Sequence, residues 1–280
     1  MLVAERRARI MAAVRRQGAA TIGDLADELD VSAMTIRRDI EALAADGHLE
    51  KVRGGATVHR RPDADDRRFT TRTDRMREEK RAIARRAAAL VEPGMAVGLS
   101  GGTTTWALAQ ELRSIPDVTV VTNSLPVADT FQRPDRADEP YTQTVVLTGG
   151  VRTPSDALVG PVAVRSLEHL HCDLVFLSVY GIDVQAGLTT TNLLEAETDR
   201  ALAAAGREAI VLADHAKWGV VGLTTIMDLH EIDRLITDDG LPEEARQVIG
   251  GEVGELWVVP VGDIAETGVD VEATADSASD

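Results

Sequence analysis

Cysteine, long apolar runs and positive charge are all scarce in this sequence of 280 residues. Cys172 is the only cysteine, which excludes disulfides and cysteine-rich metal sites, and its apolar neighbours Leu174–Leu177 predict a buried, inert thiol. His169 and His171 lie beside it without further convincing metal ligands. No run approaches the roughly 20 apolar residues of a membrane helix, and the charged start is not that of a signal peptide. We therefore expect a cytoplasmic protein with no membrane partner, metal or cofactor.

The remaining composition is that of an ordinary folded protein. Hydrophobic residues make up 44% of the chain and charged residues 27%, which is enough apolar material for a substantial core. A chain of this length exceeds one average domain and fits a medium domain plus a small module. We therefore expect two domains.

The net charge of -16 argues at first against a nucleic-acid partner, because binding to DNA phosphates needs local positive charge. The acidic residues are unevenly distributed, however. Residues 1–61 carry a net charge of +2, and residues 62–280 carry -18. The N-terminal segment is therefore compatible with DNA binding, and the acidic remainder either suppresses nonspecific binding or simply forms a solvated surface.

The N-terminal segment predicts three helices. Apolar residues at Val3, Ile10 and Val14, with arginines between them, indicate an amphipathic helix that ends near Gly18. Thr21 is an N-cap for a second helix, whose apolar positions have the i, i+3, i+4, i+7 spacing: Ile22, Leu25, Ala26 and Leu29. A tight turn follows, and Ser32 caps a third helix that ends at Gly47.

The third helix, within Ser32–Asp46, has an apolar stripe and an opposite polar face. Ile36, Ile40 and Leu43 form the stripe. Two short helices joined by a tight turn, the second with paired arginines, are typical of a recognition helix that enters the DNA major groove. The candidate DNA-contacting residues on this helix are Ser32, Met34, Thr35, Arg37 and Arg38, and the two arginines are natural donors to bases or phosphates.

Residues 48–52 and 56–59 predict a β-hairpin around Arg53, Gly54 and Gly55, in which the glycines supply positive φ angles. Such a hairpin is the wing of a winged helix-turn-helix. It would place Lys51 and Arg53 near the DNA backbone or minor groove. The alternatives are a helical module with solvated arginines and a module that binds protein.

The segment Val31–Ile40, followed by Arg53–Ala56, resembles the signature of the DeoR/GlpR-type bacterial transcriptional regulators. The resemblance extends to about residue 260. It implies a winged helix-turn-helix domain followed by a larger α/β domain, which in that family binds phosphorylated sugars or related metabolites.

Residues 60–78 predict a linker, because 12 of these 19 residues are charged and they cannot form a core. Residues 263–280 contain six acidic residues and no lysine or arginine, which predicts a disordered tail. The predicted organisation is therefore a DNA-binding domain at 1–59, a linker at 60–78, an effector-sensing α/β domain at 79–262 and a tail at 263–280.

Seven short runs rich in β-branched residues alternate with helical patterns in the large domain. This alternation predicts a mostly parallel sheet covered by helices on both faces, in a domain that resembles the sugar-phosphate isomerases. The runs are Met95–Leu99, Val118–Val121, Thr144–Leu147, Leu174–Val179, Ala209–Leu212, Arg234–Ile236 and Leu256–Val259.

Small and polar residues follow six of these strands, at the edge where ligands bind in open α/β sheets. Any one of these segments is more often an ordinary turn, so their recurrence carries the prediction of a polar cleft. The candidate effector-binding residues from these ends are Gly101, Gly102, Thr103, Thr104, Thr105, Asn123, Gly150, Asp183, Asp214 and Lys217.

The first segment, Gly101–Thr105, opens directly into a helix that continues through Trp106. Backbone N–H groups at a helix start, together with threonine hydroxyls, form a site for an anion. The segment lacks the Gly-Lys-Ser/Thr of a nucleotide-binding P-loop and the Gly-x-Gly-x-x-Gly of a dinucleotide site. The phosphate of a small molecule suits it better; the alternative is a helix start with nothing bound.

Two residues outside the strand ends complete the candidate set. Lys80 falls on the apolar stripe of a predicted helix at Glu79–Val91, so it needs either an anion or an exit to water. Glu195 belongs to an Asn192-x-x-Glu195 capping box and serves either that cap or a ligand. Asp214 and Lys217 either pair with each other or contact a sugar phosphate.

Two functions fit this pattern. The first is a repressor of carbohydrate-metabolism genes that binds a double-stranded operator and is released by a phosphorylated sugar-like effector. It requires a homodimer or homotetramer, because two DNA half-sites must be read together. The alternative is an enzyme like the sugar-phosphate isomerases or deaminases, with Asp183, Glu195, Asp214 and Lys217 as acid-base groups. No catalytic carboxylate pair is recognisable in the sequence, which favours the non-enzymatic regulator.

Overall fold

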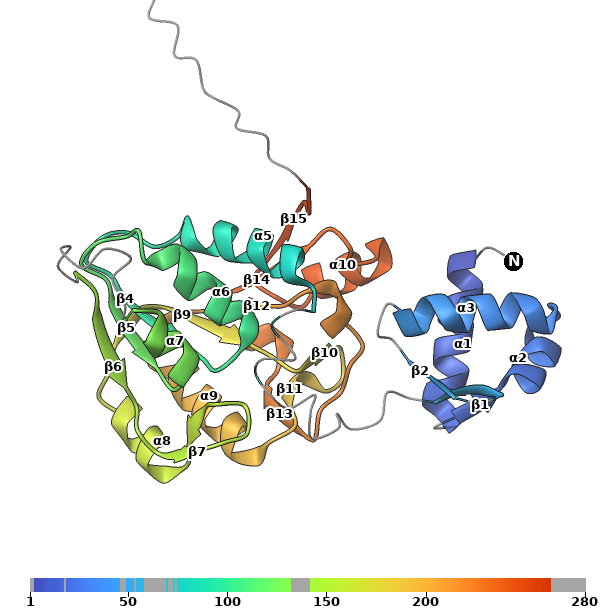
Figure 1. The fold of residues 1–280 in the computed structure, drawn as a ribbon, viewed down its shortest axis with the longest axis horizontal. Coiled ribbons are helices and arrows are strands. Elements are labelled where there is room, and N and C mark those ends of the chain that lie inside the picture. The colour runs from blue at the N-terminus through green and yellow to red at the C-terminus, as the bar shows by residue number, and fades with distance from the viewer. Residues whose placement is uncertain are drawn as a thin grey trace, which may run out of the picture.

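The computed structural model describes residues 3–17, 19–45, 49–52, 54–57, 69, 73, 75–131 and 142–262. It contains a small helical N-terminal domain and a larger α/β domain (Figure 1). Arg53, the tail at 263–280 and most of the predicted linker lie outside the described residues.

The three predicted N-terminal helices are confirmed. They are α1 (Val3–Gln17), α2 (Ile22–Leu29) and α3 (Ala33–Ala45). Both predicted N-caps form, because the Thr21 hydroxyl accepts the backbone N–H of Asp24 and the Ser32 hydroxyl accepts that of Thr35. The apolar stripe of α3 is buried against α1 and α2, with Ile36 and Ile40 both fully inaccessible.

The predicted wing also forms, with one strand more than expected. Strand β2 (Glu50–Val52) pairs antiparallel with β3 (Gly55–Thr57), and β3 pairs in turn with β1 (Ala19–Thr21). Only Gly54 needs a positive φ, at 90°. Gly55 is instead required by close packing, because a Cβ there would lie 2.2 Å from the Ala20 carbonyl oxygen. The expectation that both glycines supply positive φ angles is therefore corrected.

A buried carboxylate joins the first and third helices. Asp39 on α3 is only 3% exposed. It accepts hydrogen bonds from Nε of Arg6 at 2.5 Å and from Nε of Arg7 at 3.2 Å. Charges buried in this way are tolerated only when they are paired, so these contacts fix α1 across the back of the exposed α3 face.

The large domain is built on a seven-stranded sheet in the order β15-β14-β12-β9-β4-β5-β6, and every neighbouring pair is parallel. All seven predicted runs belong to it. The strands are β4 (Ala96–Leu99), β5 (Thr119–Thr122), β6 (Thr144–Leu147), β9 (Cys172–Ser178), β12 (Gly206–Leu212), β14 (Arg234–Asp238) and β15 (Glu255–Val259).

Helices cover both faces of this sheet (Figure 1). Alternate residues of β9 point to opposite faces: Phe176 packs with the core under α5, α6 and α7, and Val175 with the core under α8, α9 and α10. The helices are α5 (Arg77–Ala88), α6 (Thr103–Leu112), α7 (Leu125–Thr130), α8 (Pro161–Leu167), α9 (Leu193–Ala204) and α10 (Glu243–Gly250).

Five short strands lie outside the main sheet and are not predicted by the sequence pattern. Strands β10 (Gly181–Asp183), β11 (Gly187–Thr190) and β13 (Thr224–Met227) form a small antiparallel sheet. Strands β7 (Val151–Arg152) and β8 (Leu158–Val159) form a hairpin. Their glycines and two- to four-residue lengths hide the period-2 pattern. Both units flank the carboxyl edge of the main sheet and supply residues to the site described below.

The contacts of Asp39 with Arg6 and Arg7 should stabilise the N-terminal domain. Replacing Asp39 by alanine leaves Arg6 and Arg7 without their buried partner, which should cost about 3 kcal/mol of folding free energy. Hydrogen exchange of the α1 and α3 amides should accelerate, with the amides of the main sheet as an internal reference. Asp27→Ala, an exposed substitution on α2, is the matched control. Equal protection in the two variants would contradict this role for Asp39.

Candidate functional site

The polar face of α3 is exposed as the sequence predicts. Met34 is 56% exposed, and Arg37 and Arg38 are also exposed. Neither arginine makes a hydrogen bond or ion pair with a described residue, so both guanidinium groups are available for contacts with DNA. The hydroxyls of Ser32 and Thr35 lie 2.9 Å apart at the start of the helix.

Lys51 on the wing is not free in the same way. Its ammonium group contacts the Glu41 carboxylate of α3 at 2.5 Å, and both side chains are about half exposed. The hydrogen bond from Lys51 holds the pKa of Glu41 below its ordinary value. A DNA phosphate would therefore compete with Glu41 for Lys51. The sequence pattern does not reveal the contact between Lys51 and Glu41.

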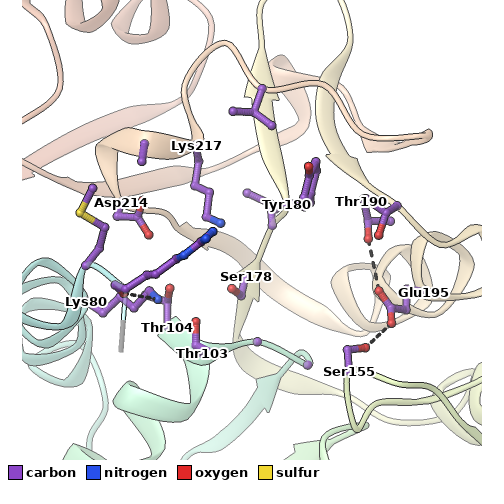
Figure 2. Close-up of a pocket in the computed structure, with 18 of the residues that line it drawn as sticks. Lys80, Thr103, Thr104, Ser155, Ser178, Tyr180, Thr190, Glu195, Asp214 and Lys217 are labelled. Atoms are coloured by element: carbon purple, nitrogen blue, oxygen red, sulfur yellow. Dashed lines mark hydrogen bonds between the residues drawn. The ribbon is translucent and has the colours of Figure 1, made fainter. Parts of the chain in front are cut away.

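The second site is a cavity of about 510 Å³ at the carboxyl edge of the main sheet (Figure 2), a size typical of small-molecule sites. It is lined by residues that follow β4, β9 and β12, three adjacent strands. The chain continues from β4 toward β5 and from β9 toward β12, in opposite directions along the sheet. The cavity therefore lies where the strand order reverses, the usual ligand position in such sheets.

Eight of the twelve predicted effector-binding residues line this cavity. They come from α5, from the start of α6, from α9 and from the segment after β12: Lys80, Gly101, Gly102, Thr103, Thr104, Glu195, Asp214 and Lys217. Ala44 and Ala45, at the end of α3, also border it.

One end of the cavity is suited to an anion. Helix α6 begins at Thr103, and no side chain caps its N-terminus, so the first N–H groups lack an intrahelical acceptor. Gly102 is needed for space, because a Cβ there would lie 2.2 Å from Cβ of Ser178. The hydroxyl side chains of Thr103 and Thr104 are buried at the same place. Backbone donors, hydroxyls and the nearby lysines together provide the donors that a phosphate group requires.

Lys80 does not extend to solvent, as one of the two sequence interpretations allowed. It is 5% exposed, lines the cavity and donates from Nζ to the backbone carbonyl of Arg75 at 2.6 Å. Lys217 lies on the same side of the cavity (Figure 2), with Nζ 6.0 Å from the centre of the Tyr180 ring. Two lysines from separate elements therefore serve this end, and Arg75 also lines the cavity.

Asp214 is buried, at 3% exposure, and its Oδ1 has no hydrogen-bond partner among the described residues. No Asp214–Lys217 ion pair within 4.0 Å forms, contrary to one sequence interpretation. A buried carboxylate oxygen without a partner is unfavourable. A ligand hydroxyl would satisfy it.

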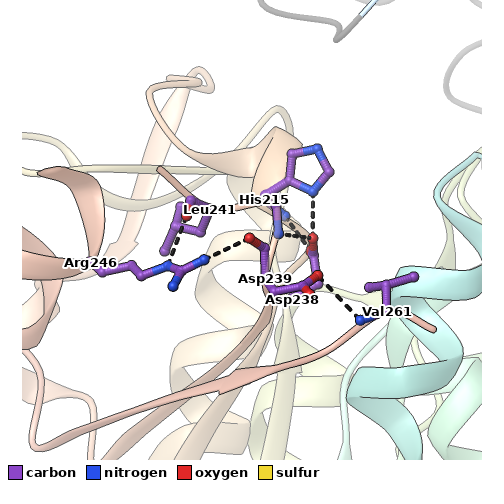
Figure 3. Close-up of polar contacts among 7 residues, drawn as sticks. His215, Asp238, Asp239, Leu241, Arg246 and Val261 are labelled. Carbon is purple, nitrogen blue, oxygen red and sulfur yellow. Dashed lines mark hydrogen bonds and ion pairs between the residues drawn. The ribbon is translucent and has the colours of Figure 1, made fainter. Parts of the chain in front are cut away.

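The short helix that carries Lys217 is held by a buried ion pair (Figure 3). His215 Nδ1 lies 2.5 Å from Oδ2 of Asp238, and the His215 backbone N–H donates to Oδ1 at 2.7 Å. The hydrogen bond to Asp238 raises the pKa of His215 above its ordinary value. Burial alone would raise the pKa of Asp238, but the hydrogen bonds from His215 outweigh it and lower that pKa.

The opposite end of the cavity contains Glu195, with Ser155 and Thr190 beside it (Figure 2). Asn192 caps α9 as predicted, because its side chain accepts the N–H groups of Leu194 and Glu195. The Glu195 carboxylate does not complete the capping box. It accepts hydrogen bonds from the hydroxyls of Ser155 and Thr190 instead, which leaves it facing the cavity.

Four predicted effector residues do not line the cavity. Asp183 accepts the N–H groups of Gln185 and Ala186 in a turn, and Thr105 donates to the Ser100 carbonyl. Gly150, at φ 117°, allows close packing on Val159 in the β7–β8 hairpin. Asn123 is buried beside Gly101, with both polar side-chain atoms unpartnered among the described residues. The structure therefore explains Asp183, Thr105 and Gly150 by local geometry.

Several cavity residues are not anticipated from the sequence. They lie in the β7–β8 hairpin, at and after the end of β9, in the small sheet and in the second turn of α9: Ser155, Ser178, Tyr180, Thr190 and Asp199. Asp199 follows Glu195 by four residues, so one helix face carries both carboxyl groups. That spacing is the one signal in the sequence that points to Asp199.

The His215–Asp238 pair predicts a pH-dependent stability. Because the pKa of His215 is raised, the pair stabilises the fold fully below about pH 6.5, the ordinary histidine value. This contribution is lost as the pH rises through the raised pKa. The difference in Tm between wild type and His215→Ala should therefore be largest near pH 6 and shrink toward pH 9. The same comparison with His230→Ala, an exposed histidine, serves as control; a His215 difference that is constant with pH would contradict the assignment.

Comparisons with known proteins agree with this architecture. Residues 6–61 match the model of the DeoR-like helix-turn-helix domain, and residues 75–239 match that of the DeoR C-terminal sensor domain. The transcriptional regulator GolR of Listeria innocua is 37% identical over 239 residues, 84% of this chain and 90% of GolR. The repressor GlcR of Bacillus subtilis is 32% identical, with 86% and 90% of the two chains covered.

Among solved structures, the ribose 5-phosphate isomerase A of Methanocaldococcus jannaschii is similar over 51% of this chain and 55% of its own. The TM-score is 0.37 at 17% identity, and this partial likeness carries no argument about function. Among the described residues, no group of three or more His, Cys, Asp and Glu side chains is placed to hold a metal ion. None of the described helices has the length and apolar character needed to cross a membrane.

The two family models together cover the helix-turn-helix and most of the α/β domain, and the relatives match along nearly their whole length. These relatives are DNA-binding regulators, so the alternative of an enzyme is set aside. This chain belongs to the DeoR family of transcriptional regulators.

Proposed function

We propose that this regulator represses genes of carbohydrate metabolism and is released from its operator by a phosphorylated sugar or related metabolite. The observation that carries the proposal is the convergence of Lys80, Lys217 and the uncapped start of α6 on one cavity. A phosphate group satisfies all three, because it accepts hydrogen bonds and carries negative charge.

The names of two relatives support the carbohydrate assignment. One is a putative repressor of the aga operon in Escherichia coli, 32% identical over 250 residues, and another is named an L-fucose operon activator in Haemophilus influenzae, also 32% identical. The activator shows that regulators of opposite sign occur among these relatives. Repression is the sign that we propose for this chain.

The contact between Lys80 and Arg75 provides a route from the cavity to the DNA-binding domain. Arg75 and Met76 line the cavity immediately before α5, in the part of the chain that leads from the N-terminal domain. Met76 has a positive φ of 50°, which is unfavourable for a residue with a side chain. A phosphate that binds Lys80 would weaken its hydrogen bond to the Arg75 carbonyl, and this segment would then relax.

The operator-bound form that we propose is a homodimer or homotetramer in the cytoplasm. One recognition helix reads one half-site, so a palindromic operator requires two copies of α3 about one DNA turn apart. A change in the Arg75–Met76 segment that alters the spacing or mobility of the two heads would weaken binding to both half-sites at once.

The exposed arginines of α3 provide a test of DNA binding. Arg37→Ala together with Arg38→Ala should reduce affinity for a DNA fragment from the protein's own promoter region by at least about 30-fold, at about 1–3 kcal/mol for each direct base contact. Electrophoretic mobility shift at two salt concentrations provides the measurement. Arg165→Ala, on α8 of the other domain, is the control. Unchanged binding by the double variant would reject α3 as the recognition helix.

The cavity lysine provides a test of effector release. In the wild type, a panel of sugar monophosphates should contain at least one compound that dissociates the protein–DNA complex. Lys80→Gln should raise the concentration required by about 10- to 100-fold, because a hydrogen bond to a charged group contributes about 1.5–3 kcal/mol. Arg81→Gln, on the exposed face of the same helix, should respond like the wild type. If no phosphorylated sugar releases the wild-type complex, the proposed effector class is wrong.

A further inference from the structure

The cavity has two chemically different ends (Figure 2). Lys80, Lys217 and the carboxylate of Asp214 lie at one end, and Glu195 lies at the other, with Ser178 and Tyr180 between them. Helix α9 carries a second cavity-lining carboxyl group, Asp199, one turn after Glu195. The lysines therefore account for an anion at the first end but leave the purpose of the carboxyl groups unexplained.

Asp199 is a buried polar side chain that the rest of the fold does not use. It is 6% exposed and lines the cavity. It makes no hydrogen bond or ion pair with any described residue, and its oxygens are not among the enclosed, unpartnered atoms. The carboxyl group is therefore reached from the cavity. Leaving such a group unpartnered in a fold is unfavourable, so its placement points to a ligand.

The charge state of Asp199 matters for which ligand group fits. Burial raises the pKa of Asp199 well above its ordinary value, and the negative charge of Glu195 raises it further. The raised pKa favours the neutral carboxylic acid, which has one O–H donor and a carbonyl acceptor.

Glu195 has the complementary chemistry. The hydroxyls of Ser155 and Thr190 both donate to its carboxylate, which fixes its orientation. A carboxylate has about four lone-pair sites, so acceptor capacity remains for a ligand. The basic residues that line the described cavity are Arg75, Lys80 and Lys217, and none comes from α9 or the β7–β8 hairpin. A second anionic group beside Glu195 would therefore be repelled by its negative charge, with no cation supplied by these two elements.

We propose that Glu195 and Asp199 form a hydroxyl-recognition subsite that determines which phosphorylated compound this regulator senses. A hydroxyl both donates and accepts, so it donates to Glu195 while it accepts from Asp199. The effector then has one phosphate, bound at the lysine end, and an uncharged polyhydroxyl portion at the α9 end. A second phosphate at that end is disfavoured. This inference rests on the proposed phosphate site, and it specifies the chemistry of the part of the effector that lies beyond the phosphate.

The first test compares inorganic phosphate with a panel of sugar monophosphates, including glucose 6-phosphate, fructose 6-phosphate and ribose 5-phosphate. Isothermal titration gives the ratio of the inorganic phosphate Kd to the Kd of the best monophosphate. This ratio should fall at least tenfold in Glu195→Gln and in Asp199→Ala. Asp199→Asn keeps a donor and an acceptor and should recover most of the ratio. Glu197→Gln, exposed on the same helix, is the matched control, and thermal unfolding without ligand shows that each variant is folded.

The second test uses matched pairs that differ only in a second phosphate. Wild type should bind fructose 6-phosphate and glucose 6-phosphate at least tenfold more tightly than fructose 1,6-bisphosphate and glucose 1,6-bisphosphate. Glu195→Gln should narrow this preference, because it removes the negative charge that the second phosphate would face.

The outcomes separate the two proposals. If wild type binds neither inorganic phosphate nor any monophosphate, the proposed effector class fails, and the subsite fails with it. If monophosphates bind but the ratio of the two Kd values stays the same in the Glu195 and Asp199 variants as in the wild type, the subsite alone is overturned. The same conclusion follows if wild type prefers the bisphosphates.

Discussion

The parallel register of the central strands is the constraint on which the rest of the structure depends. Because β12, β9 and β4 run in the same direction, the segments that follow them must emerge at one edge of the sheet. That edge therefore collects glycines for close approach, the open start of α6 and the turn that carries Asp214 and Lys217. The strand order reverses between β4 and β9, so the helices diverge there and leave a cavity. The position of the ligand site therefore follows from the strand order of the sheet and does not depend on any single side chain.

Several polar groups at this edge are buried, which costs folding free energy. Hydrogen bonds within the fold offset this cost for some of them but not for all. Lys80 is partly compensated by the carbonyl of Arg75, and the turn after β12 is anchored by Asp238 through His215. The adjoining Asp239 loop is also held, because Arg246 donates to the Asp239 carbonyl and the Val261 N–H donates to its carboxylate (Figure 3). By contrast, one oxygen of Asp214 has no partner among the described residues. Rigid supports beside unsatisfied polar atoms are characteristic of a preorganised binding site.

The sequence predicts the elements well and the site in part, for physical reasons. The central strands are buried on both faces and have continuous apolar runs, and the edge strands β6 and β15 also have short apolar runs. All seven strands of the main sheet are therefore recognisable, and so are the caps of α2 and α3. The β7–β8 hairpin and the small sheet are too short for a periodic signal, and residues such as Ser155 and Thr190 reach the cavity only through tertiary packing. Asp183 follows an apolar run as Asp214 does, yet it closes a turn. Strand-end position alone does not separate ligand contacts from turn formation.

The cavity has two ends of different chemistry: donors at the start of α6 and on two lysines, and carboxyl groups on α9. The most direct measurement is a crystal structure of the full chain with a sugar monophosphate that releases it from DNA. The account predicts that the phosphate contacts the backbone N–H groups of residues 102–104 and Lys80, with the sugar hydroxyls toward Glu195. A phosphate bound beside α9, or a ligand bound outside this cavity, would contradict it.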